Sequence, residues 1–171
     1  MRDIRHFRKL HIALAAASLA LSGCGEFKDV HHPGSPEHDD FSVRNTIQTL
    51  DQTTLPAEQL ADLYLDDAVI LRPGLPEVRG RAAIVALMKE QAAGPALEMT
   101  HRIDEIARFD DVIVVQGGVT GEARPADGSG PFPFATQNLI VFKRNGKEVP
   151  KIWKVIYNAA PEAALNGSSS Q

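Results

Sequence analysis

One histidine and two tyrosines are the side chains of this chain best suited to acid–base chemistry. His101 lies in an alternating stretch typical of a strand, and Tyr64 and Tyr157 are the only tyrosines. An imidazole titrates near neutral pH and can act as a general base, while a phenol can donate a hydrogen bond to a developing oxyanion. A lone histidine is nevertheless more often a structural residue, and a tyrosine a core aromatic. The catalytic residues stay unknown at this level, with these three as candidates.

Candidate ligand-binding residues come from strand alternation and from one loop. In the stretch 99–109, His101 and Glu105 share the more apolar face, which should point toward the helices. In the stretch 151–158, Trp153 and Tyr157 share a face. Two arginines flank a proline- and glycine-containing loop and could meet an anionic ligand, although solvated surface arginines are commoner. The ligand-binding candidates are therefore Arg72, His101, Glu105 and Trp153, with Arg79 as the second loop arginine.

Motifs for metals and cofactors are absent from the sequence. It contains no phosphate-binding loop, no nucleophile elbow and no histidine–carboxylate pair at metal-ligand spacing. His31, His32 and His38 lie in a segment interrupted by prolines, which does not impose the geometry that a metal requires. We therefore expect neither a metal nor a cofactor.

The amino terminus has the order of a secretory signal. Four basic residues (Arg2, Arg5, Arg8 and Lys9) precede an apolar run over 10–21, which ends in Leu21-Ser22-Gly23-Cys24. This ending resembles the lipobox of bacterial lipoproteins, in which the cysteine receives a diacylglycerol and the chain is cut before it. A cytosolic protein with an apolar first helix is the alternative. The resemblance predicts that Cys24, modified by fatty acids such as palmitate, anchors the protein to a membrane.

The net charge and the cysteine content argue against several classes of function. Cleavage before Cys24 would leave 148 residues and would remove a net charge of +3 from a chain of formal net charge −4, so the mature chain would carry −7. Such an acidic protein is a poor candidate for binding nucleic acid. Acylation of Cys24, the only cysteine, would exclude disulfides and thiol catalysis. In bacteria with two membranes, an aspartate directly after the lipidated cysteine retains a lipoprotein in the inner membrane. Gly25 stands at that position, so this resemblance predicts the periplasmic face of the outer membrane in such a host, and the cell envelope in general.

The remaining pattern predicts one α+β domain. Residues 1–23 form the signal peptide, 24–37 a flexible tether, 38–162 the domain and 163–171 a disordered tail. We expect a helix from Asp39 and a second helix from Pro56 through Tyr64, ended by Asp66-Asp67, then a short strand over 68–71 and a helix ending near Gly94. Longer strands are predicted over 99–109, 112–122, 132–144 and 151–158. Helices followed by an antiparallel meander favour a sheet covered by helices on one face.

Two blocks of sequence resemble a known family. Residues 64–71 (YLDDAVIL), a proline–glycine loop and 78–84 (VRGRAAI) resemble the start of SnoaL-like proteins of the nuclear transport factor 2-like superfamily; 139–144 (LIVFKR) and 153–158 (WKVIYN) resemble their end. The resemblance implies a cystatin-like cone, in which a curved, mostly antiparallel sheet wraps around helices and leaves a pocket at its open end. Family members often carry an aspartate in the final strand near the position of Val155, so this chain departs from that pattern.

Three functions are compatible with these observations. The first is a lipid-anchored binding or accessory domain whose cone takes a small, partly apolar ligand. The second is a small enzyme that performs cyclisation, isomerisation or hydration by acid–base catalysis, as the resemblance allows. The third is a structural partner that forms a homodimer through the sheet face. An inward histidine bonded to a second acid–base group beside an open cavity would favour the enzyme.

Overall fold

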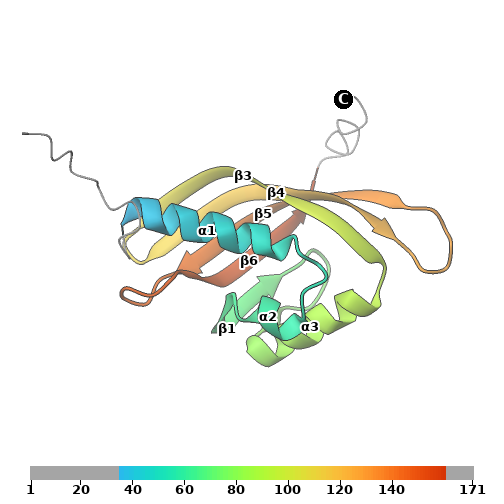
Figure 1. Cartoon of the computed structure of the whole chain (residues 1–171), viewed down its shortest axis with the longest axis horizontal. Helices are drawn as coiled ribbons and strands as arrows, with labels where there is room; N and C mark the ends of the chain where they lie inside the picture. Colours follow the sequence, from blue (N-terminus) through green and yellow to red (C-terminus); the bar gives the residue numbers. More distant parts are fainter. Residues whose placement is uncertain (1–34, 161–171) are drawn as a thin grey trace, which may run out of the picture.

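The fold is a six-stranded sheet with helices on one face. The computed structural model describes residues 35–160. Its elements are α1 (Pro36–Leu50), α2 (Ala57–Ala61), β1 (Tyr64–Leu71), β2 (Val78–Arg79), α3 (Arg81–Ala93), β3 (Ala96–Phe109), β4 (Val112–Arg124), β5 (Phe132–Lys143) and β6 (Lys151–Ala159). The strand order is β2-β1-β6-β5-β4-β3. All pairs are antiparallel except β1 with β6. The sheet is curved, and α1 lies along one face while α2 and α3 lie together beside β1 (Figure 1). The predicted α+β class is confirmed.

The first helix begins three residues earlier than predicted. Ser35 caps it, because its Oγ accepts a hydrogen bond from the backbone N–H of His38 at 3.1 Å, and Pro36 occupies the first turn. The last two residues of the predicted tether, Pro36 and Glu37, therefore belong to the helix. The signal peptide, Cys24, the rest of the tether and the tail after 162 lie outside the described residues. None of the described helices is long and apolar enough to cross a membrane.

The second helix is much shorter than predicted. It ends at Ala61, and Tyr64 already belongs to β1, where it pairs with Ile152 of β6. The backbone carbonyl of Leu63 accepts a hydrogen bond from Ile152 N–H at 2.9 Å. Pairing with a strand almost ninety residues away thus overrides the local helical spacing. Asp66 and Asp67, predicted to end the helix, are instead exposed strand residues.

The core lies between α1, α3 and the helix-covered face of the sheet, which we call the concave face. Val43, Ile47 and Leu50 of α1 are buried, and so are Ile84 and Leu87 of α3, whereas Phe41, whose spacing also predicts the apolar side of α1, is 53% exposed. The largest fully buried side chain is Phe142 of β5. Complete burial of such a side chain contributes about 1.5–3 kcal/mol relative to leaving it exposed. The helices are therefore held on the sheet mainly by apolar packing.

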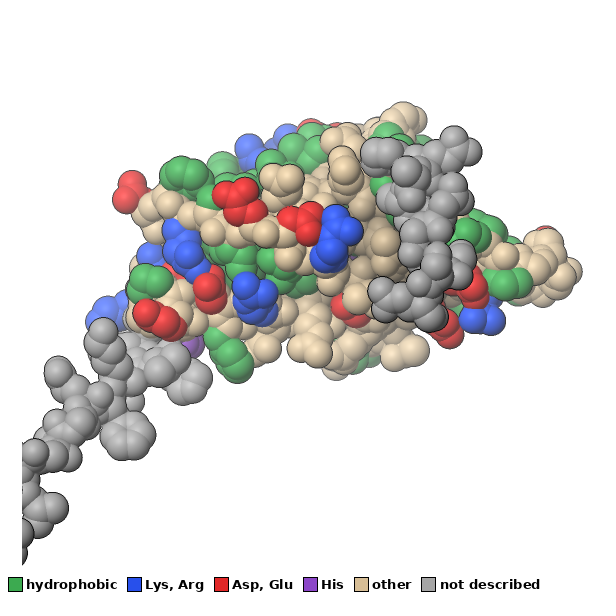
Figure 2. All heavy atoms as spheres, turned by 90° about the horizontal axis from the view of Figure 1, so that it is seen from above, with side chains coloured by type: hydrophobic (Ala, Val, Ile, Leu, Met, Phe, Trp, Pro, Cys, Tyr) green, Lys and Arg blue, Asp and Glu red, His purple; other side chains and the backbone are tan. Residues whose placement is uncertain are grey.

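One buried ion pair fixes the start of α1 on the sheet. A guanidinium nitrogen of Arg144 lies 2.6 Å from the Asp39 carboxylate, and their side chains are only 19% and 6% exposed. Arg144 also donates to the carbonyl of Asp110 in the β3–β4 turn at 3.2 Å. Asp40 pairs with Arg108 of β3 beside it. Seen from above, acidic and basic side chains are mixed with hydrophobic ones over the visible surface (Figure 2).

Two β-bulges change the faces predicted from simple alternation. In β3 the register shifts between Ile103 and Glu105, so Glu105 is exposed and Ile106 packs against the core in its place. In β6, Lys154 pairs with Val141 and Ile152 pairs with Phe142, which leaves Trp153 as the extra residue. Ile152 and Val155 are consequently both buried. The prediction that Glu105 points inward is wrong, because a bulge inserts a residue and reverses the alternation after it.

Candidate active site

The concave face is apolar at one end. The register aligns one inward residue from each of five neighbouring strands, and all five are hydrophobic. From β1 to β3 they are Ile70, Val155, Ile140, Val115 and Ile106. Val155 of β6 is the second residue of this row, between Ile70 and Ile140, and is 1% exposed. This end of the face packs against the helices and contains no group that could move a proton.

Two residues further along the strands, the same face becomes polar. Leu71 pairs with Ile156, so Arg72 follows β1 beside Tyr157, and Tyr157 pairs with Asn138 of β5. Ile70 and Val155 point into the core, and alternation puts Arg72 and Tyr157 on that side as well. The next row along the strands contains Thr136 and, across β4, His101. Polar groups from four strands therefore converge beyond the apolar row.

His101 is held by an aspartate from the end of α1. Its ring Nδ1 lies 2.6 Å from Asp51 Oδ1, and its backbone N–H donates to the same oxygen at 3.0 Å. The His101 side chain is 3% exposed and that of Asp51 is 22% exposed. Asp51 caps α1, and two residues later Thr53 Oγ donates to the carbonyl of Leu97 in β3 at 3.0 Å. Because a carboxylate faces Nδ1, the proton of the neutral ring resides there and the lone pair is on Nε2.

The two tyrosines lie deep in the domain. Tyr64 is 3% exposed. Burial raises its pKa well above the usual value, and the nearby Tyr157 adds to the effect. Burial also raises the pKa of Tyr157 to about 12, while the positive charge of Arg72 opposes this shift. Both phenols are therefore neutral at physiological pH and can donate hydrogen bonds.

Several buried polar atoms of this region have no hydrogen-bond partner within residues 35–160. They come from β3, from β5 and from the loop that follows β1, and they share the polar end of the concave face. They are His101 Nε2, Arg72 Nε, Thr136 Oγ1 and Asn138 Nδ2. A buried polar group without a partner costs about 1–3 kcal/mol, so a cluster of such groups is characteristic of a site that receives a polar molecule.

A cavity opens at this end of the sheet. Its volume is about 600 Å³, and Asp51 and Thr53 form one wall while β3, β4 and β5 form the others. Met99, Gly121 and Phe134, which line it, make up the row that follows His101 and Thr136 along the strands. A side chain at Gly121 would collide with the carbonyl of Glu98, 2.2 Å from the position of its Cβ, so glycine permits the close approach of β3 and β4. Asp51 thus lies between the cavity and the buried histidine.

Comparisons with known proteins agree with this architecture. The profile of the SnoaL-like domain matches residues 43–149, more than half of the chain. This protein belongs to the SnoaL-like domain family. No curated protein matches it in sequence.

Solved structures similar to this SnoaL-like domain include a ketosteroid isomerase-like protein from Erwinia carotovora atroseptica, with a TM-score of 0.63 and 15% identity over 71% of this chain and 94% of that one. A conserved protein from Planctomyces limnophilus gives a TM-score of 0.64 and 16% identity over 72% and 98%. An NTF2-like protein with a cystatin-like fold from Novosphingobium aromaticivorans gives 0.57 and 17% over 78% and 90%. At these identities the likeness establishes the fold, and the cystatin-like architecture is confirmed.

The SnoaL-like domain brings some of the predicted residues together and separates others. His101, Tyr64, Tyr157 and Arg72 all belong to the concave side, whereas Glu105 is exposed beyond the bulge. Trp153 points away from the core: its indole N–H lies 3.3 Å from Asp67 Oδ2, and the ammonium groups of Lys143 and Lys154 lie 5.2 and 4.2 Å from its ring centre. Arg79 is exposed and pairs with Glu77 at 2.8 Å.

Three residues of the site were not predicted from the sequence. Asp51, Thr136 and Asn138 are ordinary polar residues by type and spacing. Asn138 gave a faint signal, because it is an amide inside an otherwise apolar strand, and such a residue is expected to make hydrogen bonds. Asp51 gave none, because its partner is fifty residues away. Among the described residues, no three His, Cys, Asp or Glu side chains are grouped so that they could hold a metal.

Proposed function

We propose that this SnoaL-like domain binds a small, partly apolar molecule at the polar end of the concave face and transfers a proton on it, with His101 as general base. The observation that carries the proposal is the state of His101: Nδ1 is hydrogen-bonded to Asp51, and Nε2 is buried without a partner among residues 35–160. A carboxylate at Nδ1 fixes the ring orientation and stabilises the imidazolium that forms when Nε2 takes a proton.

The surroundings of His101 suit the removal of a proton from a carbon next to a carbonyl. Such a step develops negative charge on the carbonyl oxygen, which neutral hydrogen-bond donors stabilise. Tyr157 stays protonated at neutral pH, and the amide Nδ2 of Asn138 is a second donor. Leu97, Met99 and Phe134 in the cavity wall suit the hydrocarbon part of the ligand. Isomerisation, cyclisation and dehydration all begin with this step, and none of them needs a metal or another cofactor.

Hydrogen–deuterium exchange tests the proposal directly. The protein is incubated in D₂O with a panel of cyclic and aryl ketones, and deuterium incorporation at the α-carbon is followed by NMR. The wild type should accelerate exchange of at least one compound, and His101→Asn should lower the rate about 100-fold or more. The asparagine amide can still donate to Asp51, so the fold should persist, as a circular dichroism spectrum would verify. Exchange that is equally fast in His101→Asn would refute the role of His101.

A binding or accessory role without turnover is the second candidate. It is supported by the cavity of about 600 Å³, which is within the range of small-molecule sites. Mass spectrometry of molecules that co-purify with the protein tests it. A ligand retained equally by the wild type and by His101→Asn, without exchange in either, would favour this candidate over the enzyme.

We also propose that the domain works at the cell envelope, anchored through lipid on Cys24, and at the periplasmic face of the outer membrane if the host has two membranes. Support comes from the charged start, the apolar run and the Leu21-Ser22-Gly23-Cys24 ending. Two or more acyl chains would be enough for stable attachment. Growth with a clickable fatty acid should label the wild type and leave Cys24→Ser unlabelled. An unlabelled wild-type protein free in solution would contradict the anchor.

A further inference from the structure

Arg72 is the half-buried one of two arginines within residues 35–160 that contact no carboxylate. Among residues 35–160, six arginines contact an Asp or Glu side chain: Arg79, Arg81, Arg102, Arg108, Arg124 and Arg144. Arg44 has no such contact, but it lies on an exposed position of α1. Arg72 is half-buried, and its Nε is buried without a hydrogen-bond partner in the described part of the chain. A positive charge withdrawn from water without a counter-charge is costly, so this guanidinium is positioned to receive an anion.

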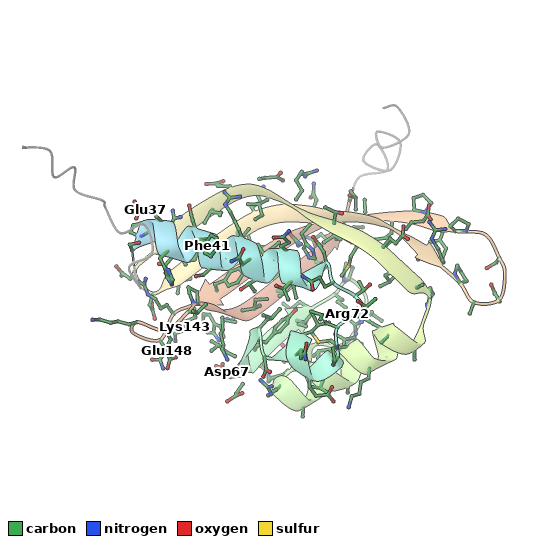
Figure 3. The ribbon with its side chains drawn as sticks, viewed as in Figure 1. Glu37, Phe41, Asp67, Arg72, Lys143 and Glu148 are labelled. Atoms are coloured by element: carbon green, nitrogen blue, oxygen red, sulfur yellow. The ribbon has the colours of Figure 1, made fainter. Side chains whose placement is uncertain are left out.

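The strand register points Arg72 toward the candidate active site. It follows Leu71, which pairs with Ile156, and so lies beside Tyr157 on the concave side. Figure 3 shows Arg72 at the end of β1, beneath the carboxyl end of α1 in this view. Asp51, which holds His101, directly follows α1. The arginine and the histidine are therefore at opposite edges of the polar end of the same face.

The groups nearest to Arg72 are hydrogen-bond donors. Tyr157, whose pKa responds to the charge of Arg72, is a neutral phenol, and Asn138 next to Tyr157 in the register offers an amide nitrogen without a partner within residues 35–160. Arg72 is not part of the cavity lining, and the acidic groups that do line it already have partners: Glu98 and Glu122 both contact Arg124, and Asp51 contacts His101. A planar guanidinium flanked by neutral donors is complementary to a carboxylate, which it can bind through two parallel N–H···O bonds.

We propose that the ligand of this site is a small carboxylic acid, bound with its carboxylate on Arg72 and its reacting carbon at His101. This inference rests on the proposed function for the role of His101, whereas the anion subsite stands on Arg72 alone. Four strand spacings separate β1, which Arg72 follows, from β3, which contains His101, roughly 19 Å along the sheet before its curvature is considered. A two-carbon acid is too short to contact both residues, so the ligand is an extended acid with an aryl or ring system between its two ends.

Matched pairs of ligands test the subsite. Binding of 4-acetylbenzoate, 3-(4-acetylphenyl)propanoate and 4′-acetylbiphenyl-4-carboxylate is measured by calorimetry on the full-length protein, next to the carboxamide of each. In all three acids a ring separates the carboxylate from the carbon that can lose a proton. At least one acid should bind the wild type tenfold or more tightly than its amide. Arg72→Gln should remove this preference, and Arg79→Gln, a charge-matched change in the same loop, should keep it. Arg72→Lys, which retains the charge without the planar fork, should keep part of it.

The outcomes separate this inference from the proposed function. The carboxylate subsite is overturned if no acid binds the wild type more tightly than its amide, or if Arg72→Gln keeps the wild-type preference. Either result counts even if exchange depends on His101. A preference for the acid that is lost in Arg72→Gln supports the subsite. This holds even if His101→Asn leaves exchange unaffected, a result that would refute only the proton transfer. If Arg72→Gln does not fold, Arg72→Lys is the deciding variant. A preference for the acid equal to that of the wild type would contradict binding through two parallel N–H···O bonds, and a reduced preference would support it.

Discussion

The two ends of the concave face are built from the same strands but have opposite chemistry. At one end, Ile70, Val155 and Ile140 fill the space under the helices and leave no polar atom. Two residues further along, Arg72 and Tyr157 occupy the equivalent positions, and buried polar atoms there have no partner within the described residues. The apolar side chains that stabilise the fold and the buried polar groups of the candidate site are therefore only two residues apart along the same strands. We therefore expect substitutions at the apolar end to change mainly the free energy of unfolding, and substitutions at the polar end to change mainly activity.

The largest expected effect on stability is at the apolar end. Phe142→Ala removes a side chain that is 0% exposed and leaves a cavity, so it should lower the free energy of unfolding by about 3–5 kcal/mol. Urea denaturation followed by circular dichroism measures it. Phe109→Ala, at a residue that is 62% exposed, is the matched control and should change stability by less than about 0.5 kcal/mol. A loss below 1 kcal/mol at Phe142 would show that this end is not tightly packed.

The next effect concerns activity at the polar end. Asp51→Asn replaces the carboxylate that fixes the proton on Nδ1 of His101 by an amide that can present either a donor or an acceptor. Exchange at the α-carbon of a ligand should slow by about 10–100-fold, less than in His101→Asn. Ligand affinity measured by calorimetry should change little. Loss of affinity together with an unchanged exchange rate would mean that Asp51 contacts the ligand and does not position the histidine.

A smaller effect should appear at alkaline pH. The pKa of Tyr157 is about 12 in the folded state and that of Tyr64 is also raised, against about 10 in an unfolded chain. The fold favours the protonated phenols, so this contribution to stability is complete below pH 10 and is lost as the pH rises through 12. Because the chain has only two tyrosines, phenolate absorbance reports on both. Ionisation of either phenol near pH 10 in the folded protein would contradict their burial.

The smallest effect is expected for a polar residue that has no partner. Thr136→Val removes a buried hydroxyl without a hydrogen bond and keeps nearly the same shape, so stability should stay within about 1 kcal/mol of the wild type or rise slightly. Thermal unfolding with and without ligand measures the change. Thr136 and Phe142 are both on the inward side of β5, which makes the pair a direct comparison of the two ends. A loss at Thr136 as large as at Phe142 would remove the distinction between them.

Much of the fold could be predicted from the sequence, because the long strands and the apolar side of each long helix are local patterns. The spacing of Val43, Ile47 and Leu50 is sufficient for α1. The bulges could not be predicted, since they depend on how a neighbouring strand is paired. Tyr64 was predicted in a helix because its spacing is helical, and it is in a strand because β6 pairs with it.

The candidate site was predicted only in part for a related reason. His101 and the tyrosines stand out by residue type alone. The assignment of His101 as a general base depends on its hydrogen bond to Asp51. These two residues are fifty positions apart, so no local sequence pattern could predict their contact. The same applies to Arg72: the sequence favours a solvated surface arginine, and its parallel pairing beside Tyr157 brings it to the concave side.

The place of β6 has a consequence for the order of events during synthesis. The last strand of the chain lies between β1 and β5, and its pairing with β1 is the single parallel pair between the described strands. Strand β1 therefore cannot join the rest of the sheet until residues 151–159 have been synthesised. Long-range pairing of this kind slows folding, so the sheet closes only after the last strand of the chain is in place.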